Sequence, residues 1–124
     1  MTLATDILLI EDEPGVMDVM LRVLQRAGFS VRTAQDGSTA LAALYECQPA
    51  LAILDLVLPG MSGFAVLAHI RQQYPALPVI LITANPQAIA HPAAQSVGHY
   101  LLKPFHAEEL LDMVARAGID SQMG

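Results

Sequence analysis

Four carboxylates stand where short apolar runs of the sequence end. Glu11, Asp12 and Glu13 follow directly on one such run, and Asp55 ends another. Carboxylates that are held close together repel one another, which raises their pKa values unless a cation neutralises them. A hard ion such as Mg²⁺ prefers oxygen ligands and takes one or two carboxylates while keeping several waters. A fold that gathers these side chains is therefore predicted to bind Mg²⁺.

Two further polar side chains end apolar runs in the second half of the chain. Thr83 supplies a hydroxyl, and Lys103, the only lysine in the sequence, supplies an ammonium. A lone lysine opposite an acidic cluster is a point charge suited to an anion such as a phosphoryl group. In phosphoryl transfer the protein mainly positions groups and stabilises charge with a metal and a cation. These residue types therefore indicate phosphoryl chemistry.

The apolar runs alternate with helical patterns along the chain. Five short, β-branched runs are expected to form strands, at residues 7–10, 29–34, 51–55, 78–83 and 99–102. Apolar residues at helical spacing predict helices at about 14–27, 37–47, 64–74 and 107–117. Either Asp12 or Glu13 is expected to cap the first helix. Five βα units predict an α/β fold in which helices cover both faces of a parallel sheet.

This architecture decides where the polar residues meet. In an open α/β sheet, ligands bind outside the carboxyl ends of the strands, at the point where the strand order reverses. The carboxylates, the threonine and the lysine all stand at predicted strand ends. We therefore expect them to converge on one rim of the sheet.

Composition narrows the class of protein. The chain has 124 residues, of which 54% are apolar, and we expect one domain with a core at about residues 6–117. A formal charge of −6 argues against direct binding to nucleic acid. A single cysteine, Cys47, excludes an internal disulfide and any CxxC site. No signal peptide or membrane-spanning run is visible, so a cytoplasmic location is expected.

Four segments, each at a predicted strand end, resemble the receiver domains of two-component response regulators, including single-domain chemotaxis-type regulators. They are ILLIEDE (7–13), ILDLVLPGMSG (53–63), ITA (82–84) and LKPF (102–105). The resemblance covers about residues 6–117, and four motifs in the correct order are highly specific. It implies a doubly wound sheet of five parallel strands in the flavodoxin-like order 2-1-3-4-5.

The resemblance also implies a phosphoacceptor site. Asp55 would accept a phosphoryl group from a sensor histidine kinase or a histidine phosphotransfer protein. Glu11, Asp12 and Asp55, together with the backbone carbonyl of Val57, would hold Mg²⁺. Lys103 would neutralise the acyl phosphate, and Thr83 would belong with Asp55 and Lys103 to the catalytic residues. The domain would then be no enzyme toward other substrates, because it would catalyse only its own phosphorylation and dephosphorylation.

Other positions acquire expected roles in the same way. Thr83 and Tyr100 would couple phosphorylation to a change of shape, and the Lys103–Pro104 peptide bond would be cis. In this family the residue two after the acceptor helps to position the hydrolytic water. Val57 has no polar group there, which predicts a long-lived phosphoryl group, although Asn85 could partly compensate.

Three alternatives share parts of this pattern. A flavodoxin-like FMN protein needs a Gly/Ser/Thr-rich phosphate loop after its first strand, where Glu11, Asp12 and Glu13 would repel phosphate. A haloacid-dehalogenase-type phosphatase carries a second acid two residues after its nucleophile, on the first strand, whereas Val57 follows Asp55 on the third. A pseudo-receiver, which has the same fold but serves as an unphosphorylated interaction module, stays as the alternative.

The interval between Thr83 and Lys103 departs from the family pattern. It is shorter by about two residues, and it contains Pro86 and Pro92. A proline inside a helix removes a hydrogen bond and clashes with the preceding turn, at a cost of about 3 kcal/mol. We therefore expect a fourth helix that is short or broken between Pro86 and Val97. The fourth helix, the fifth strand and the last helix form the family's usual dimer and output surface. Because this surface would be irregular here, we expect a monomer or weak dimer that signals to a downstream protein.

Overall fold

The computed structural model describes residues 6–118. Its centre is a sheet of five parallel strands in the order β2-β1-β3-β4-β5. The strands are β1 (Asp6–Ile10), β2 (Ser30–Ala34), β3 (Leu51–Asp55), β4 (Val79–Thr83) and β5 (Tyr100–Leu102). The predicted fold class and strand order are therefore confirmed.

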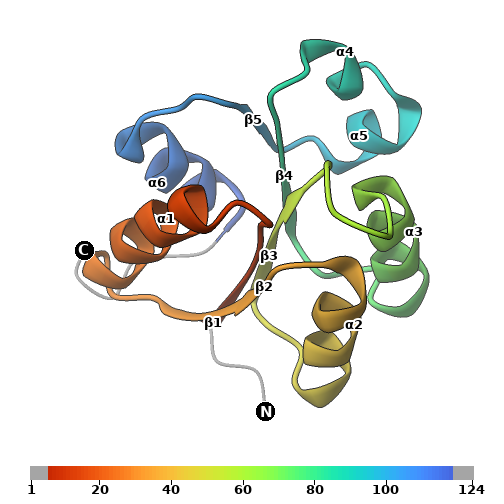
Figure 1. Cartoon of the computed structure of the whole chain (residues 1–124), viewed down its shortest axis with the longest axis horizontal. Coiled ribbons are helices and arrows are strands. Elements are labelled where there is room, and N and C mark those ends of the chain that lie inside the picture. The colour runs from red at the N-terminus through yellow and green to blue at the C-terminus, as the bar shows by residue number, and fades with distance from the viewer. Residues whose placement is uncertain (1–5, 119–124) are drawn as a thin grey trace.

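In the described part of the chain, six helices surround the sheet. They are α1 (Pro14–Arg26), α2 (Gly37–Glu46), α3 (Gly63–Gln73), α4 (Pro86–Ile89), α5 (Pro92–Val97) and α6 (Ala107–Arg116). Helices α1 and α6 pack on one face, whereas α2, α3 and α5 lie on the other (Figure 1). The predicted ends of the elements agree with the observed ones to within one residue.

The alternation of side chains along the central strands builds two cores. On β1, Leu8 and Ile10 point into the core beneath α2 and α3, while Ile7 and Leu9 point into the core beneath α1 and α6. All four are fully buried. A parallel sheet with both faces covered requires such continuous apolar runs, which is why the strands show little polar alternation in the sequence.

The fourth helix is broken, as the prolines predict. Helix α4 has four residues, and α5 starts anew with Pro92 at its first position. There the missing N–H of proline costs nothing, because the first helical N–H groups have no partner inside a helix. His91 precedes Pro92 and accepts the N–H of Ala93 at its Nδ1, at 3.1 Å. Its ring stacks on Phe64 of α3, with 4.3 Å between ring centroids.

The start of α1 differs in one detail from the expectation. Glu13 occupies the N-cap position, but its side chain makes no capping hydrogen bond.

Within residues 6–118, no helix combines the length and the apolar composition needed to cross a membrane.

Candidate functional site

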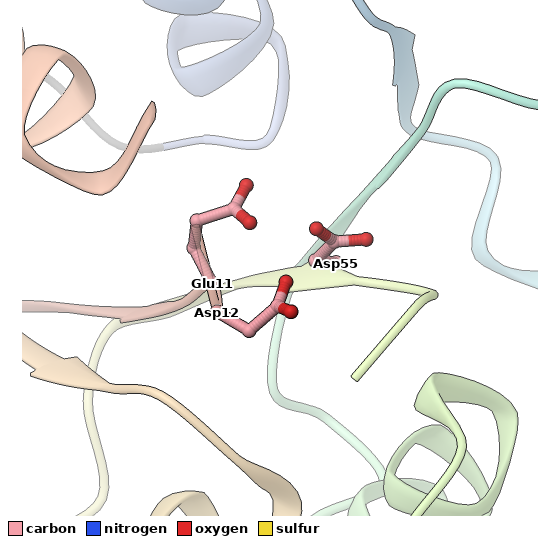
Figure 2. Close-up of side chains that lie close together, drawn as sticks. All are labelled: Glu11, Asp12 and Asp55. Atoms are coloured by element: carbon pink, nitrogen blue, oxygen red, sulfur yellow. The ribbon is translucent and has the colours of Figure 1, made fainter. Parts of the chain in front are cut away.

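The strand register brings the first acidic residues to Asp55. Strands β1 and β3 pair in parallel, and Ile10 lies opposite Leu54. Glu11 and Asp55 are the next residues after this pair, so they meet at the carboxyl rim of the sheet. Asp12 follows, and the three carboxylates each place an oxygen within 4.8 Å of the others. Figure 2 shows them grouped where β1 and β3 end.

Strands β4 and β5 bring Lys103 to the same place. Thr83 of β4 pairs with Leu102 of β5, and Lys103 follows directly. The Nζ atom of Lys103 lies 2.8 Å from Asp55 Oδ2 and 2.8 Å from Glu11 Oε1. It also lies 3.6 Å from Glu13 Oε1. The predicted convergence of carboxylates and an ammonium on one rim is thus observed.

Burial makes these charges interact strongly. The side chains of Glu11 and Asp55 are 0% and 3% exposed, and that of Lys103 is 15% exposed. Burial first, and then contact with Asp55, raise the pKa of Glu11 to about 7, against the opposing effect of Lys103. Burial lowers the pKa of Lys103, but its contacts with Asp55 and Glu11 outweigh burial and raise it above its ordinary value. Lys103 therefore stays charged, while Glu11 is protonated in part of the molecules near neutral pH.

The donor set fits a divalent cation. Glu11 Oε1 is buried and, among the described residues, has no partner in hydrogen-bonding geometry, although Lys103 attracts it by charge. Asp12 is partly exposed and completes the three-carboxylate group. Oxygen ligands of this kind, one of them an unsatisfied buried carboxylate oxygen, are those that Mg²⁺ takes. The ligand role of the Val57 carbonyl stays a prediction.

Backbone groups hold the acceptor carboxylate in place. The N–H of Val57 donates to Asp55 Oδ1 at 2.9 Å, so each Asp55 oxygen has a partner. Gly63 begins α3 close behind, and its N–H donates to the carbonyl of Leu56 at 3.1 Å. A Cβ at Gly63 would lie 2.6 Å from the Asp55 carbonyl oxygen. This glycine is a positioning residue to which the sequence analysis assigned no role, although it ends the second of the four motif segments.

The expected switch residues take the following positions. Thr83 is 1% exposed, and its Oγ1 accepts the N–H of Asn85 at 3.0 Å. Tyr100 is half-buried at the start of β5 and packs against the core beneath α2 and α3. Its switching role stays a prediction. The Lys103–Pro104 peptide bond is cis, the isomer that the resemblance implies.

A groove opens beside the acidic cluster. It has a volume of about 460 Å³ and runs between the first turns of α1 and the segment 103–105 after β5. Apolar side chains such as Val16, Val19 and Phe105 line most of it, and Glu13 and Lys103 also line it. The groove thus lies beside the charged site and shares Lys103 with it.

The family of the chain follows from its similarity to known proteins. Residues 7–115 match the response regulator receiver domain family. A probable transcriptional regulatory protein, TcrX of Mycobacterium tuberculosis, is 37% identical over 107 residues, which are 85% of this chain and 46% of that protein. The DNA-binding transcriptional regulator NtrC of Salmonella typhimurium is 37% identical over 110 residues, 87% of this chain and 24% of NtrC. The chain thus spans less than half the length of these relatives.

Solved structures agree with this match. The response regulator protein TrrA of Thermotoga maritima, crystallised with Mg²⁺ and BeF, aligns with a TM-score of 0.86 at 30% identity, covering 91% of this chain and 98% of TrrA. The chemotaxis protein CheY4 of Vibrio cholerae aligns with a TM-score of 0.84, also at 30% identity, over the same shares of the two chains. With its sheet order, its acidic rim and its family match over most of its length, this chain belongs to the response regulator receiver domains.

Proposed function

We propose that this receiver domain accepts a phosphoryl group on Asp55 in a Mg²⁺-dependent reaction and signals through the resulting change of shape. Receiver domains partner with histidine kinases, and we propose a histidine kinase or histidine phosphotransfer protein as the donor. The observation that carries the proposal is the position of Lys103 Nζ, 2.8 Å from Oδ2 of an almost fully buried aspartate. The expected setting is the cytoplasm.

Each residue has a chemical task in this reaction. A carboxylate oxygen of Asp55 would form a bond to phosphorus while the bond from phosphorus to the donor nitrogen breaks, and the imidazole would leave with that electron pair. Lys103 would neutralise charge on the phosphoryl oxygens as it grows. The N–H of Val57 keeps the carboxylate oriented. Mg²⁺ held by Glu11, Asp12 and Asp55 would supply the positive charge that shields the anionic donor from the acidic rim.

Thr83 would transmit the reaction to the surface. Its hydroxyl oxygen now accepts the N–H of Asn85 at the start of α4. A hydroxyl can also donate, so a phosphoryl oxygen at Asp55 would offer it a strong acceptor. Turning toward that acceptor would release Asn85 and with it the anchoring of α4. The downstream partner is then expected to be a protein that reads this face.

Phosphorylation can be measured directly by intact mass. We expect the protein to gain one phosphoryl group when it is incubated with acetyl phosphate and Mg²⁺, and to gain none with EDTA. Asp55→Asn keeps the size of the side chain but cannot form the acyl phosphate, so labelling is expected to vanish. Asp112→Asn, an exposed carboxylate of α6 paired with Arg116, is the control that keeps labelling. An unlabelled wild type would instead support the pseudo-receiver alternative, which no residue of the described site favours.

A further inference from the structure

We infer that Glu13 is a competing counter-ion for Lys103, which an incoming phosphoryl oxygen must displace, and that it thereby selects against small anionic phosphodonors. The inference rests on the proposed function, because it concerns the same acceptor site. It gives a role to the one carboxylate of the acidic rim that belongs neither to the predicted metal ligands nor to the acceptor.

Three carboxylates surround one ammonium, and they are not equivalent. Glu11 and Asp55 lie at 2.8 Å from Lys103 Nζ and are almost completely buried. Glu13 lies at 3.6 Å and is 63% exposed. Separating a buried pair leaves an uncompensated charge at high cost, whereas an exposed pair is weak. When a phosphoryl oxygen binds to Lys103, Glu13 is therefore the partner that yields.

Across residues 6–118, the side chain of Glu13 makes no hydrogen bond and no ion pair other than that with Lys103. At an N-cap, the short side chains of Ser, Thr, Asp and Asn accept a backbone N–H of the first turn, whereas the side chain of Glu13 makes no such bond. Its own N–H donates to Glu11 Oε2 at 3.2 Å, which holds the main chain in place. Replacing the carboxylate by an amide therefore removes the charge near Lys103 without removing a helix cap.

The position of the pair also decides what the donor meets. Glu13 and Lys103 line the same open groove beside the acceptor, so a donor that approaches Lys103 from this side meets Glu13 as well. An intramolecular carboxylate competes at high effective concentration with a small anion, which has few other contacts. A donor protein binds through a large surface, so the loss of one weak ion pair matters little to it. Glu13 therefore favours protein donors over small phosphate compounds.

The rate of phosphorylation of the full chain is measured against acetyl phosphate concentration at saturating Mg²⁺, for wild type, Glu13→Gln and Asp112→Asn. We expect the half-saturating concentration to fall about two- to fivefold in Glu13→Gln, the range that one exposed ion pair allows, with an unchanged maximal rate. This difference in half-saturating concentration between Glu13→Gln and wild type is expected to shrink at about 1 M salt, where the screening length is about 3 Å. It is also expected to be smaller with phosphoramidate, which carries less negative charge.

Asp112→Asn removes the same charge from α6 and is expected to behave as wild type. Equal half-saturating concentrations for Glu13→Gln and wild type would overturn the inference, as would an equal gain in Asp112→Asn. A second measurement needs no turnover: sulfate is titrated without Mg²⁺ while the amide resonances of Lys103 and Ala84 are followed. Tighter sulfate binding by Glu13→Gln is expected, and equal binding would contradict the role of Glu13. If no donor labels the wild type, the proposed function fails, while the sulfate titration still decides this inference.

Discussion

Burial and contact with Asp55 raise the pKa of Glu11 to about 7, against the opposing effect of Lys103. The folded protein therefore binds a proton at Glu11 more tightly than the unfolded chain, in which this carboxyl has its ordinary pKa of 4.5. By linkage, the stabilising contribution of Glu11 is fully present below pH 4.5 and is lost as the pH rises through about 7. Above about pH 7, the metal-free protein has therefore lost the stability that the proton on Glu11 contributes at lower pH.

This raised pKa makes the stability of the protein depend on pH. In EDTA, the free energy of unfolding of wild type relative to Glu11→Gln is expected to fall between about pH 5 and pH 7.5, because the amide cannot titrate. Urea unfolding at several pH values measures it. A difference between the two proteins that stays constant over this range would contradict the raised pKa.

Val57 bears on the lifetime of the phosphoryl group. Its side chain is 68% exposed beside the acceptor and offers no group that could orient water. Asn85, the other candidate, already uses its Oδ1 to accept the N–H of Gln87 at 3.0 Å. We expect the phosphoryl group to persist well beyond seconds, and Val57→Asn to shorten its half-life severalfold. Val57→Ala, equally apolar, is the control, and a wild-type half-life of seconds would refute the prediction.

At the scale of elements, the break between α4 and α5 divides one face of the molecule. Helix α4 contains no buried residue, whereas α5 buries Ala94 completely. The stack of His91 on Phe64 further ties the start of α5 to α3. The expected short or broken helix is confirmed, and its consequences for dimerisation stay predictions.

Hydrogen exchange tests what this division implies. Local opening needs little free energy where few apolar contacts are lost. The amides of α4 are therefore expected to exchange faster than those of α3, which buries Val66, Leu67 and Ile70. Phe64→Leu removes the ring stack and is expected to speed exchange in α5 while leaving α2 unchanged. Equal protection of α4 and α3 would show that α4 is held by contacts other than burial.

The junction between β3 and α3 leaves no room for a side chain at Gly63. Gly63→Ala would place a methyl group against the Asp55 carbonyl and the backbone of Leu56, so α3 or the acceptor strand must shift. We expect a lower thermal midpoint and slower labelling of Asp55. Gly15→Ala in α1 is the matched control, because no atom lies within 4 Å of its added Cβ. That variant is expected to gain about 0.5–1 kcal/mol, since alanine favours helix over glycine.

At the scale of the whole molecule, Mg²⁺ is expected to stabilise the fold. An ion that binds only the native state adds stability by mass action, and here it would also relieve repulsion among Glu11, Asp12 and Asp55. Thermal unfolding with and without millimolar Mg²⁺ measures the shift. Asp12→Asn, which changes a partly exposed ligand, is expected to reduce that shift. Equal midpoints for the wild type would argue against a metal site.

The charge of the domain bears on its partners. TcrX and NtrC are named as transcriptional regulators, and this chain spans 46% and 24% of their lengths. The expectation that this domain itself does not bind nucleic acid rests on its charge of −6 and stays a prediction. Its preference for the monomeric state is a prediction of the same kind.

Local patterns in the sequence were sufficient to predict the helices and strands and to assign most of the site residues to one rim of the sheet. Fully buried strands of a parallel sheet must be apolar throughout, so β1, β3 and β4 can be recognised from their composition alone. Pro92 excludes a continuous helix for a reason confined to one turn. Because parallel strands end on the same edge, the residues after them could be assigned to one rim before any distance was known.

The burial of each acidic residue and its distance from Lys103 depend on the tertiary structure. The sequence places Glu11, Asp12 and Glu13 in a row, yet Glu11 is buried while Glu13 stays exposed and leaves the helix uncapped. Burial, the pKa of Glu11 and the three carboxylates around Lys103 depend on how β1, β3 and β5 are placed by packing. Those contacts join residues up to 92 positions apart, from Glu11 to Lys103, and no local pattern encodes the distance between them.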